Sequence, residues 1–263
     1  MSGSNTPRLV NATETSLAIV EAVRDRDGAT LTEVADGLDI GYSTAHNHLA
    51  TLCANNWLVK HDGEYDIGLK FLSFGEYARR RTPHYDVARR HMHELTERTN
   101  LEVEFLVEEY GRLISIVDMI GDAGGFGPPE DGKWLRVGEY YYLHNTASGK
   151  AILAELPDER VEAILDQWGL PAETPYSVTD RDELDAQLAT IREQGYAETE
   201  QEVVEGFANA GTAVQYPDGR VLGGISVGWP TYLYSDGVDA EVIEQLLDTA
   251  ASIEERIAAT SSD

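Results

Sequence analysis

The side chains best suited to recognising another molecule lie in the segment YSTAHNH, at residues 42–48. In a helix, Ser43, Thr44 and Asn47 would share the outer face. The inner face would then consist of Ala45, Leu49 and Leu52. The Asn47 amide can form two hydrogen bonds with the N6 and N7 atoms of an adenine, and hydroxyl groups can bind phosphate oxygens. This combination indicates a helix that reads base edges in the major groove of DNA.

A second, shorter helix is predicted just before this segment. Its evidence is the helical spacing of four apolar residues, Leu31, Val34, Ala35 and Leu38. Thr32 is its expected N-cap, because a threonine oxygen can accept hydrogen bonds from the first free N–H groups. We expect Gly41 to form the turn and the reading helix to run from Ser43 to about Leu52.

A two-stranded hairpin is predicted after the reading helix, from the segments WLVK and YDIGL around HDGE. Asp62-Gly63 supplies the positive φ angles that a tight hairpin turn demands. Helix, turn, helix and hairpin in this order predict a winged helix-turn-helix domain. The expected DNA contacts are Tyr42, Ser43, Thr44, His46, Asn47 and Lys60. The alternative is a small helical subdomain that only packs against the rest of the chain.

Charge is distributed unevenly along the 263 residues, whose formal net charge is −27. Residues 1–82 carry 8 Lys and Arg against 11 Asp and Glu, so residues 83–263 carry 12 against 36. The acidic excess therefore lies away from the expected DNA-binding residues. Such a surface is typical of proteins from a high-salt cytoplasm, where a Debye length of about 3 Å at 1 M salt screens the repulsion.

Length and composition favour two domains that each bury a core, because 42% of the residues are hydrophobic. The single cysteine, Cys53, excludes an internal disulfide and a Cys-rich zinc site. The sequence shows no apolar run of membrane-spanning length and no signal-peptide core, so we expect no membrane partner and a cytoplasmic protein.

Two more helices frame the expected DNA-binding domain. The first runs from about Thr13 to Arg24 and ends at Asp27-Gly28, with Leu17, Val20 and Val23 facing inward. A connecting helix, LKFLSFGEYARRR, ends before Pro83, because the residue ahead of a proline disfavours the helical conformation. We therefore predict a winged helix-turn-helix domain over residues 1–68, a linker helix over 69–82 and a second domain over 83–263.

The second domain is predicted to belong to the α+β class, with an antiparallel sheet flanked by helices. Strands are expected on both sides of Tyr110-Gly111 and at Trp134–Val137, Glu139–Leu143, Ala210–Gln215 and Val221–Val227. Helices are expected at Tyr85–Thr99, Ala147–Leu156, Asp158–Trp168, Asp180–Gln194 and Asp239–Ala259. Asp180 and Glu183 stand at the spacing of a capping box.

Three segments form a combination that is typical of one protein family. They are YSTAHNHLATL, LHNTASGKAILAELP, and REQGYAETEQEVVEGFANAGTAV followed by GGISV. On these segments the chain resembles the IclR-type transcriptional regulators, over about Leu17 to Ile257. The resemblance implies a winged helix-turn-helix, a linker helix and an effector-binding domain similar to the GAF fold. It also implies a homodimer or dimer of dimers on palindromic, double-stranded operator DNA, controlled by a small catabolic metabolite.

Two features depart from the family pattern. Where the family commonly has a basic residue late in the reading helix, this chain has Asn47 followed by His48. Asn47 can still discriminate adenine, by roughly 1–3 kcal/mol, while attraction to phosphate falls. The expected hairpin tip carries two acids, Asp62 and Glu64, where DNA would favour arginine. The hairpin therefore either contacts DNA or serves only as a packing element.

An effector pocket is expected at the start of the helix that begins near Ala147. The first turn of a helix offers free N–H groups that suit a carboxylate or a sugar hydroxyl, although Asn145 or Thr146 could instead cap this helix. By resemblance to the family, the pocket residues are Ala147, Ser148, Phe207, Asn209, Ser226 and Gly228. Phe207 would form an apolar wall, Asn209 and Ser226 would orient the ligand, and Gly228 would leave room for more than a two- or three-carbon acid.

Catalytic and metal-binding patterns fail on their spacing. Ser148-Gly149-Lys150 lacks the surroundings of a phosphate-binding loop, because His144 and Ala151 replace the required residues. GDAGGFGPPEDG opens no helix and is interpreted as a loop. The group His91, His93 and Glu94 does not form an H-E-x-x-H motif, because Glu97 stands in the place of the second histidine. We therefore expect neither an enzyme nor a bound metal or cofactor.

Two functions from different classes remain. The first is a DNA-binding regulator that responds to a sugar-derived or organic acid metabolite, consistent with carbon-source catabolism. The second is a ligand-binding or enzymatic domain whose N-terminal module serves only assembly. Non-specific DNA packaging is disfavoured, because it depends on basic charge that this chain lacks. Helix 1 and the linker helix Leu69–Arg81 are the expected sites of pairing between two copies.

Overall fold

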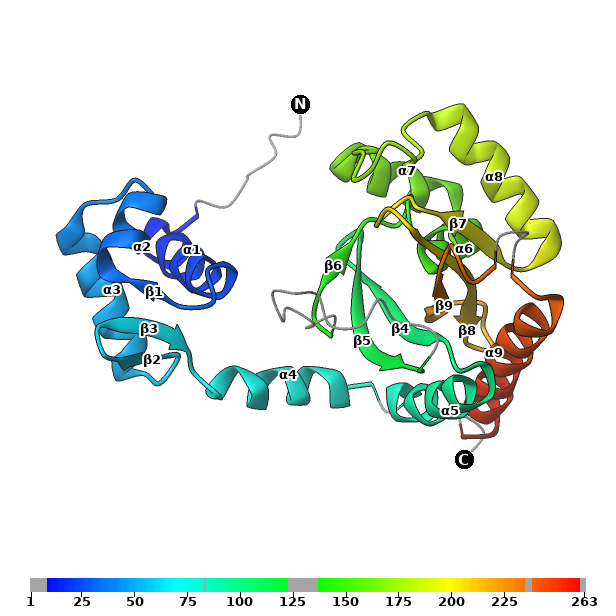
Figure 1. Ribbon diagram of the computed structural model, residues 1–263, viewed down its shortest axis with the longest axis horizontal. Coiled ribbons are helices and arrows are strands. Elements are labelled where there is room, and N and C mark those ends of the chain that lie inside the picture. The colour runs from blue at the N-terminus through cyan, green and yellow to red at the C-terminus, as the bar shows by residue number, and fades with distance from the viewer. Residues whose placement is uncertain (1–8, 83, 123–136, 235–237, 261–263) are drawn as a thin grey trace, which may run out of the picture. The chain divides into compact units, whose positions relative to one another are not determined.

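The computed structural model describes residues 9–82, 84–122, 137–234 and 238–260, and divides the chain into two compact units, residues 1–81 and 82–263 (Figure 1). Among the described residues, no helix combines the length and apolar character that a membrane span requires. The linker helix α4 (Lys70–Arg80) belongs to the first unit.

The first unit combines helices with a small sheet. Its elements in chain order are α1 (Asn11–Asp25), β1 (Ala29–Thr30), α2 (Leu31–Gly37), α3 (Tyr42–Ala54), β2 (Leu58–His61), β3 (Glu64–Ile67) and α4. The three strands pair in the order β1-β3-β2. The core contains the predicted inner face of the reading helix, Ala45, Leu49 and Leu52, together with Ile19, Val23 and Val34. Asp62 (φ 48°) and Gly63 (φ 98°) form the hairpin turn as predicted.

Three sequence predictions in this unit are wrong in detail. Thr30, not Thr32, caps α2: its hydroxyl accepts from the Glu33 N–H at 3.3 Å, and the Glu33 carboxylate accepts from the Thr30 N–H at 2.8 Å. Thr30 ends strand β1 in an extended conformation, which Thr32, inside the helix, does not have. The left-handed residue of the turn is Asp39 (φ 50°), whereas Gly41 has an ordinary φ of −60° and precedes α3. Leu17 is 59% exposed, and α1 buries Ile19 and Ala22 together with the expected Val23.

The second unit has one antiparallel sheet covered by helices on both faces. Its strands are β4 (Glu102–Glu109), β5 (Arg112–Ile120), β6 (Tyr140–Tyr141), β7 (Ala197–Glu200), β8 (Phe207–Gln215) and β9 (Val221–Pro230), in the order β6-β5-β4-β9-β8-β7. Its helices are α5 (His84–Thr99), α6 (Ala147–Glu155), α7 (Asp158–Trp168), α8 (Arg181–Gln194) and α9 (Ala240–Thr260). The predicted α+β class, with a winged helix-turn-helix and a helix-flanked antiparallel sheet, is confirmed.

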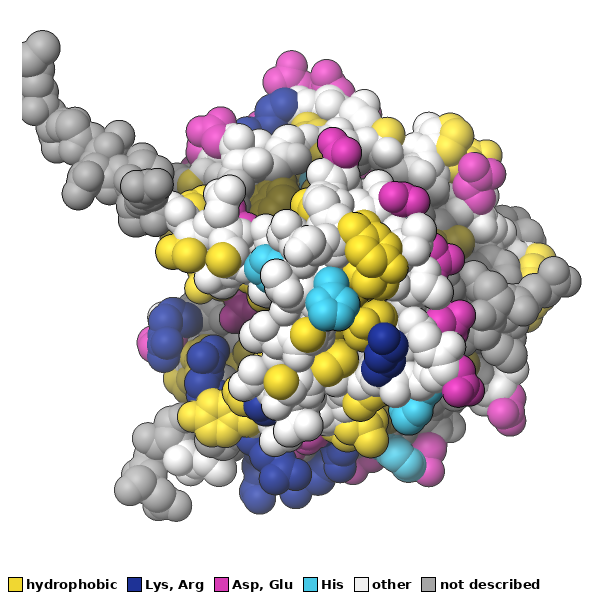
Figure 2. All heavy atoms as spheres, turned by 90° about the vertical axis from the view of Figure 1, so that its left-hand side faces the viewer, with side chains coloured by type: hydrophobic (Ala, Val, Ile, Leu, Met, Phe, Trp, Pro, Cys, Tyr) yellow, Lys and Arg dark blue, Asp and Glu magenta, His cyan; other side chains and the backbone are white. Residues whose placement is uncertain are grey.

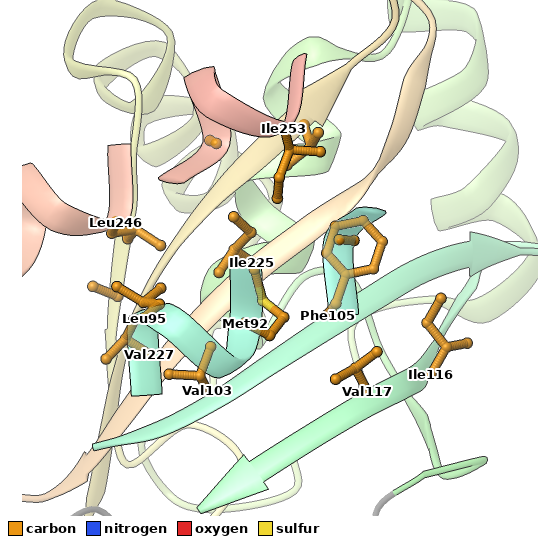
Figure 3. Close-up of a cluster of buried hydrophobic side chains, with 14 of the residues drawn as sticks. Met92, Leu95, Val103, Phe105, Ile116, Val117, Ile225, Val227, Leu246 and Ile253 are labelled. Carbon is orange, nitrogen blue, oxygen red and sulfur yellow. The ribbon is translucent and has the colours of Figure 1, made fainter. Parts of the chain in front are cut away.

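Because successive side chains along each strand point to opposite faces of the sheet, the core of the second unit is divided into two clusters. Helices α5 and α9 pack on one face of the sheet, where Met92, Phe105, Ile225 and Ile253 meet (Figure 3). Helices α6, α7 and α8 enclose a second cluster on the other face, which contains Leu106. On β4, Val103, Phe105 and Val107 therefore face α5 and α9. The residues between them, including Glu104, face α6.

The expected strands of this unit differ from the observed ones at the sheet edges. Strand β7 is not predicted, and β6 covers Tyr140–Tyr141 rather than Glu139–Leu143. Of the expected strand at 134–137, Val137 lies in a turn and the rest is outside the described residues, as is most of the glycine-rich loop at 121–132. Asp180 caps α8 as expected, accepting from the Glu183 N–H at 3.0 Å.

Candidate functional site

The outer face of α3 is open to solvent. Tyr42 begins the helix, and the five DNA-contact residues expected on it are all exposed: Tyr42, Ser43, Thr44, His46 and Asn47. The face on which α2 and α3 lie in Figure 1 carries mostly uncharged, apolar and His side chains at its centre, with most Asp and Glu at its margin (Figure 2). The exposed amide and hydroxyl groups of α3 are able to meet base edges and phosphates.

Helix α3 is fixed to α1 by a side-chain contact as well as by the core. The Nδ1 atom of His48 lies 2.8 Å from the Ser16 hydroxyl. His48 is half-buried, whereas its neighbour Asn47 is exposed. His48 is therefore a positioning residue within the first unit, and Asn47 is the one free to contact DNA.

The hairpin gives Lys60 a partner of its own. The Lys60 Nζ atom lies 3.1 Å from the Tyr65 hydroxyl and 4.7 Å from the centre of the Tyr65 ring. At the tip, His61, Asp62 and Glu64 are exposed. The ammonium group of Lys60 is thus held against the hairpin, and the tip itself presents two carboxylates.

The second unit contains a cavity of about 130 Å³ between the sheet and α6. It is lined by Glu104, Leu106, Tyr141, Thr146, Ala147, Ser148, Val203, Val204, Phe207, Asn209 and Ser226. Five of the six residues expected in the effector pocket are therefore brought together, and Gly228 is the exception. Thr146 holds the N-cap position of α6, but its side chain makes no capping hydrogen bond. The Asn145 amide donates to Glu173 at 2.7 Å, and the Thr146 hydroxyl donates to the Tyr142 carbonyl at 3.0 Å.

Gly228 does not enlarge the cavity, contrary to the expectation from sequence. A Cβ atom at this position would lie 2.5 Å from the Asn209 amide nitrogen and 2.6 Å from the Phe207 ring. The two side chains thus occupy the space above the glycine, because Asn209 is paired with Gly228 across β8 and β9. Gly228 has a structural role: the absence of a side chain leaves room for Asn209 and Phe207, which line the cavity.

Glu104 is the acidic lining residue that sequence reasoning missed. Its side chain faces the cavity, the residue is only 8% exposed, and its Oε1 atom has no hydrogen-bond partner among the described residues. Burial and, to a smaller extent, the nearby Asp118 carboxylate raise the pKa of Glu104 to about 8. A hydrogen bond from Ser115 acts in the opposite direction and lowers it. Burial raises the pKa of Asp118 to about 6. The signal in the sequence is the alternation of Glu102 and Glu104 with apolar residues along one strand.

One wall of the cavity is anchored by a buried ion pair. Lys150 on α6 is 1% exposed, and its Nζ atom donates to the Glu202 carboxylate and, at 2.8 Å, to Gln187. The Glu202 carbonyl accepts from the Ser177 hydroxyl at 2.6 Å. Val203 and Val204, which line the cavity, follow Glu202 directly. The pair therefore sets the distance between α6 and this wall.

The histidines of α5 do not assemble a metal site. The His91 ring lies 2.9 Å from the Val87 carbonyl oxygen of its own helix, and His93 lies 3.7 Å from Glu97. Within the described ranges no group of three or more His, Cys, Asp or Glu side chains has an arrangement that could hold a metal ion.

Both units match family models. The IclR helix-turn-helix domain matches residues 12–62, and the domain described as bacterial transcriptional regulator IclR C-terminal matches residues 80–255. The chain belongs to the IclR family of transcriptional regulators. This IclR-family chain is 30% identical, over 255 residues that cover 95% of each sequence, to the probable HTH-type transcriptional regulator ArcR of Halobacterium salinarum.

Solved structures share the fold of this IclR-family chain. The IclR protein of Thermotoga maritima superposes with a TM-score of 0.74 at 24% identity, covering 94% of this chain and 97% of that one. An IclR homologue from Microbacterium hydrocarbonoxydans, complexed with 4-hydroxybenzoate, superposes with a TM-score of 0.76 at 22% identity, covering 94% and 99%. The resemblance inferred from the three sequence segments is thus confirmed, and with it the assignment to transcription regulation.

Proposed function

We propose that this IclR-family regulator binds a specific operator through α3 and that a small metabolite in the cavity beside α6 controls this binding. The observation that carries the proposal is the exposed row of uncharged hydrogen-bonding side chains on α3, in the same chain as a domain with a cavity beside α6. The structural relative complexed with 4-hydroxybenzoate supports a small-molecule effector. The competing proposal, an assembly module attached to a ligand-binding or enzymatic domain, predicts no preference for operator DNA.

The test is binding of the purified chain to the DNA upstream of its own gene, in concentrated KCl, against random DNA of equal length. Specific complexes typically bind at least about a thousandfold more tightly than non-specific ones. We expect such a preference for a site within the upstream DNA. Equal affinity for both DNAs would support the assembly-module alternative.

Substituting Asn47 with alanine is expected to reduce discrimination more than total affinity. The lost amide removes two hydrogen bonds to one adenine, an effect of roughly 1–3 kcal/mol, or about five- to a hundredfold in operator preference. Affinity for random DNA should change little, because Asn47 carries no charge. Both affinities are measured by fluorescence anisotropy for the wild type and the variant. If operator and random DNA lose affinity equally, Asn47 does not read a base.

Salt is expected to stabilise the second domain, because residues 83–263 carry 36 Asp and Glu against 12 Lys and Arg. Lowering KCl from molar to tens of millimolar lengthens the Debye length from about 3 Å to more than about 10 Å and strengthens the carboxylate repulsion. The melting temperature should fall over this range, and calorimetry at a series of KCl concentrations measures it. A constant melting temperature would contradict adaptation to high salt.

We also propose that two copies pair through the first unit. Leu17 on α1 and Leu69, Leu72 and Tyr77 at or on α4 are large apolar side chains exposed by 59% to 85%. Burial of such side chains contributes about 25 cal/mol per Å² of apolar area. We expect a homodimer, or a dimer of dimers, by light scattering in high salt. A Leu72→Glu/Tyr77→Glu variant should be monomeric; a wild type that is monomeric at micromolar concentration contradicts pairing.

A further inference from the structure

We infer that the effector carries a protonated amine, whose counter-ion in the cavity is the Glu104 carboxylate. The inference rests on the proposed function, in which this cavity is the effector site, and it narrows the class of metabolite. It differs from the expectation of a sugar-derived or organic acid effector, which came from family resemblance and from the start of α6.

The first support is that a buried polar atom faces the cavity without a partner. Glu104 is 92% buried, and its Oε1 atom accepts no hydrogen bond among the described residues. A buried carboxyl oxygen without a partner is unfavourable, by about 1–3 kcal/mol or more, unless a ligand completes it. The Ser148 hydroxyl, on the opposite wall, likewise has no described partner. Two polar groups therefore converge on a space that is otherwise lined largely by apolar side chains.

The second support is the sign of charge in the cavity. The described lining residues include one carboxyl group, Glu104, and no Lys, Arg or His. The charged group that acts on Glu104 is Asp118, directly opposite it on β5. From the other side β9 places Ser226 opposite Glu104, and Ala147, Ser148, Val203 and Val204 contribute no charge. An anionic ligand would meet the Glu104 carboxyl group, with Asp118 opposite it on β5, and no cationic lining side chain, whereas a cationic ligand would neutralise the Glu104 carboxylate.

The third support is the position of Glu104 in the interior of the fold. Glu104 lies in β4, a central strand, and not at a sheet edge where water could replace a ligand. Surface salt bridges elsewhere in the chain give no comparable site, because their carboxylates already bind arginines, as Glu162 binds Arg181. An ammonium group at Glu104 would not have to displace an arginine or lysine side chain. Its charge-assisted hydrogen bond would form in a medium of low dielectric, where it is strong.

The experiment uses three probes of equal length that differ in one group: butylamine, 1-butanol and butanoate. Binding to the full chain is measured by isothermal titration calorimetry at pH 7 in molar KCl. Because hydrogen bonds between charged groups contribute about 1.5–3 kcal/mol, butylamine should bind about ten- to a hundredfold more tightly than 1-butanol. Butanoate should bind more weakly than either. Tighter binding of butanoate, or no detectable binding of butylamine, would overturn the inference.

Two variants locate the effect. Glu104→Gln keeps the shape of the side chain and removes its charge, so it should abolish the preference for butylamine. Glu109→Gln, at the exposed end of the same strand, removes one charge away from the cavity and should preserve the preference. If Glu104→Gln prefers butylamine as strongly as the wild type, the preference comes from the general negative charge of the chain and the inference is wrong.

Counting the protons released on binding distinguishes an ion pair with Glu104 from simple filling of the cavity. A protonated Glu104 must lose its proton to the buffer when an ammonium group binds. The binding enthalpy of butylamine at pH 7 should therefore change with the ionisation enthalpy of the buffer, corresponding to release of about one proton. The Glu104→Gln variant should show no such change. Operator binding by the same samples tests the proposed function separately: retained operator preference without an amine preference overturns this inference alone.

Discussion

Replacing Lys150 with methionine is expected to destabilise the second unit by about 3–5 kcal/mol, because it leaves the Glu202 carboxylate buried without its cation. Methionine fills most of the volume of the lysine stem, so the loss of charge dominates over the loss of packing. Glu202 is 7% exposed and keeps the Val178 N–H as a donor, at 3.2 Å. Urea unfolding in molar KCl, followed by circular dichroism, measures the change.

Two further variants test the cause. In Lys150→Met/Glu202→Leu both charges are gone, and most of the lost stability should return, because apolar replacements of a buried ion pair are often neutral or stabilising. Arg181→Met breaks the exposed pairs with Glu162 and Asp185 and should change stability by at most about 1 kcal/mol. If Lys150→Met is no more harmful than Arg181→Met, the buried pair does not hold the cavity wall.

The wall that Lys150 supports also bears on effector binding. Val203 and Val204 lie between Glu202 and Phe207, so a change at Glu202 reaches the cavity within two residues. An effector controls DNA binding only through different affinities for two states of the regulator. The segment 201–206, fixed at one end by Lys150 and at the other by β8, is a part of the cavity whose position a ligand could bias.

The helices were the most predictable part of the fold, because their apolar residues repeat at helical spacing over two or more turns. Ala45, Leu49 and Leu52 are buried as expected, and their positions determine which side chains of α3 face outward. Two short strands, β1 and β7, were missed. Strand β1 has two residues, and β7, at a sheet edge, has the sequence AETE, whose charged residues are unusual in strands.

The cavity could be predicted in outline but not in its chemistry. Family resemblance indicated Ser148, Asn209 and Ser226, whereas Glu104 required knowledge that helices cover both faces of the sheet. In an open sheet the same alternation would place Glu104 in water. Gly228 illustrates the same limit, since the side chains that fill its space depend on the pairing of β8 with β9. Sequence spacing gives the face on which a residue lies, but the surroundings of that face come from tertiary packing.

Stability is expected to fall as the pH rises from about 5 to about 8, because the native state holds a proton on Glu104 that the unfolded state has lost. The pKa of Glu104 is raised to about 8, while a carboxyl group in an unfolded chain titrates near 4.3. Between these values the native state binds more protons, so the free energy of unfolding decreases, by at most about 1.4 kcal/mol per pH unit for this group. Above its native pKa the loss is complete and the curve becomes flat.

The measurement is urea unfolding at fixed KCl from pH 6 to 8.5, a range in which ordinary carboxyl groups stay ionised. Glu104→Gln should remove this slope, so its stability relative to the wild type should rise by about 2–3 kcal/mol between pH 6 and pH 8.5. Asp118→Asn is the matched control: the pKa of Asp118 is raised only to about 6, so its own contribution is lost mainly below this range. Removing its charge should also lower the pKa of Glu104 and move the wild-type slope towards lower pH. A Glu104→Gln variant with the wild-type pH profile would mean that Glu104 is ionised in the folded protein, and that the unpaired Oε1 atom is reached by water.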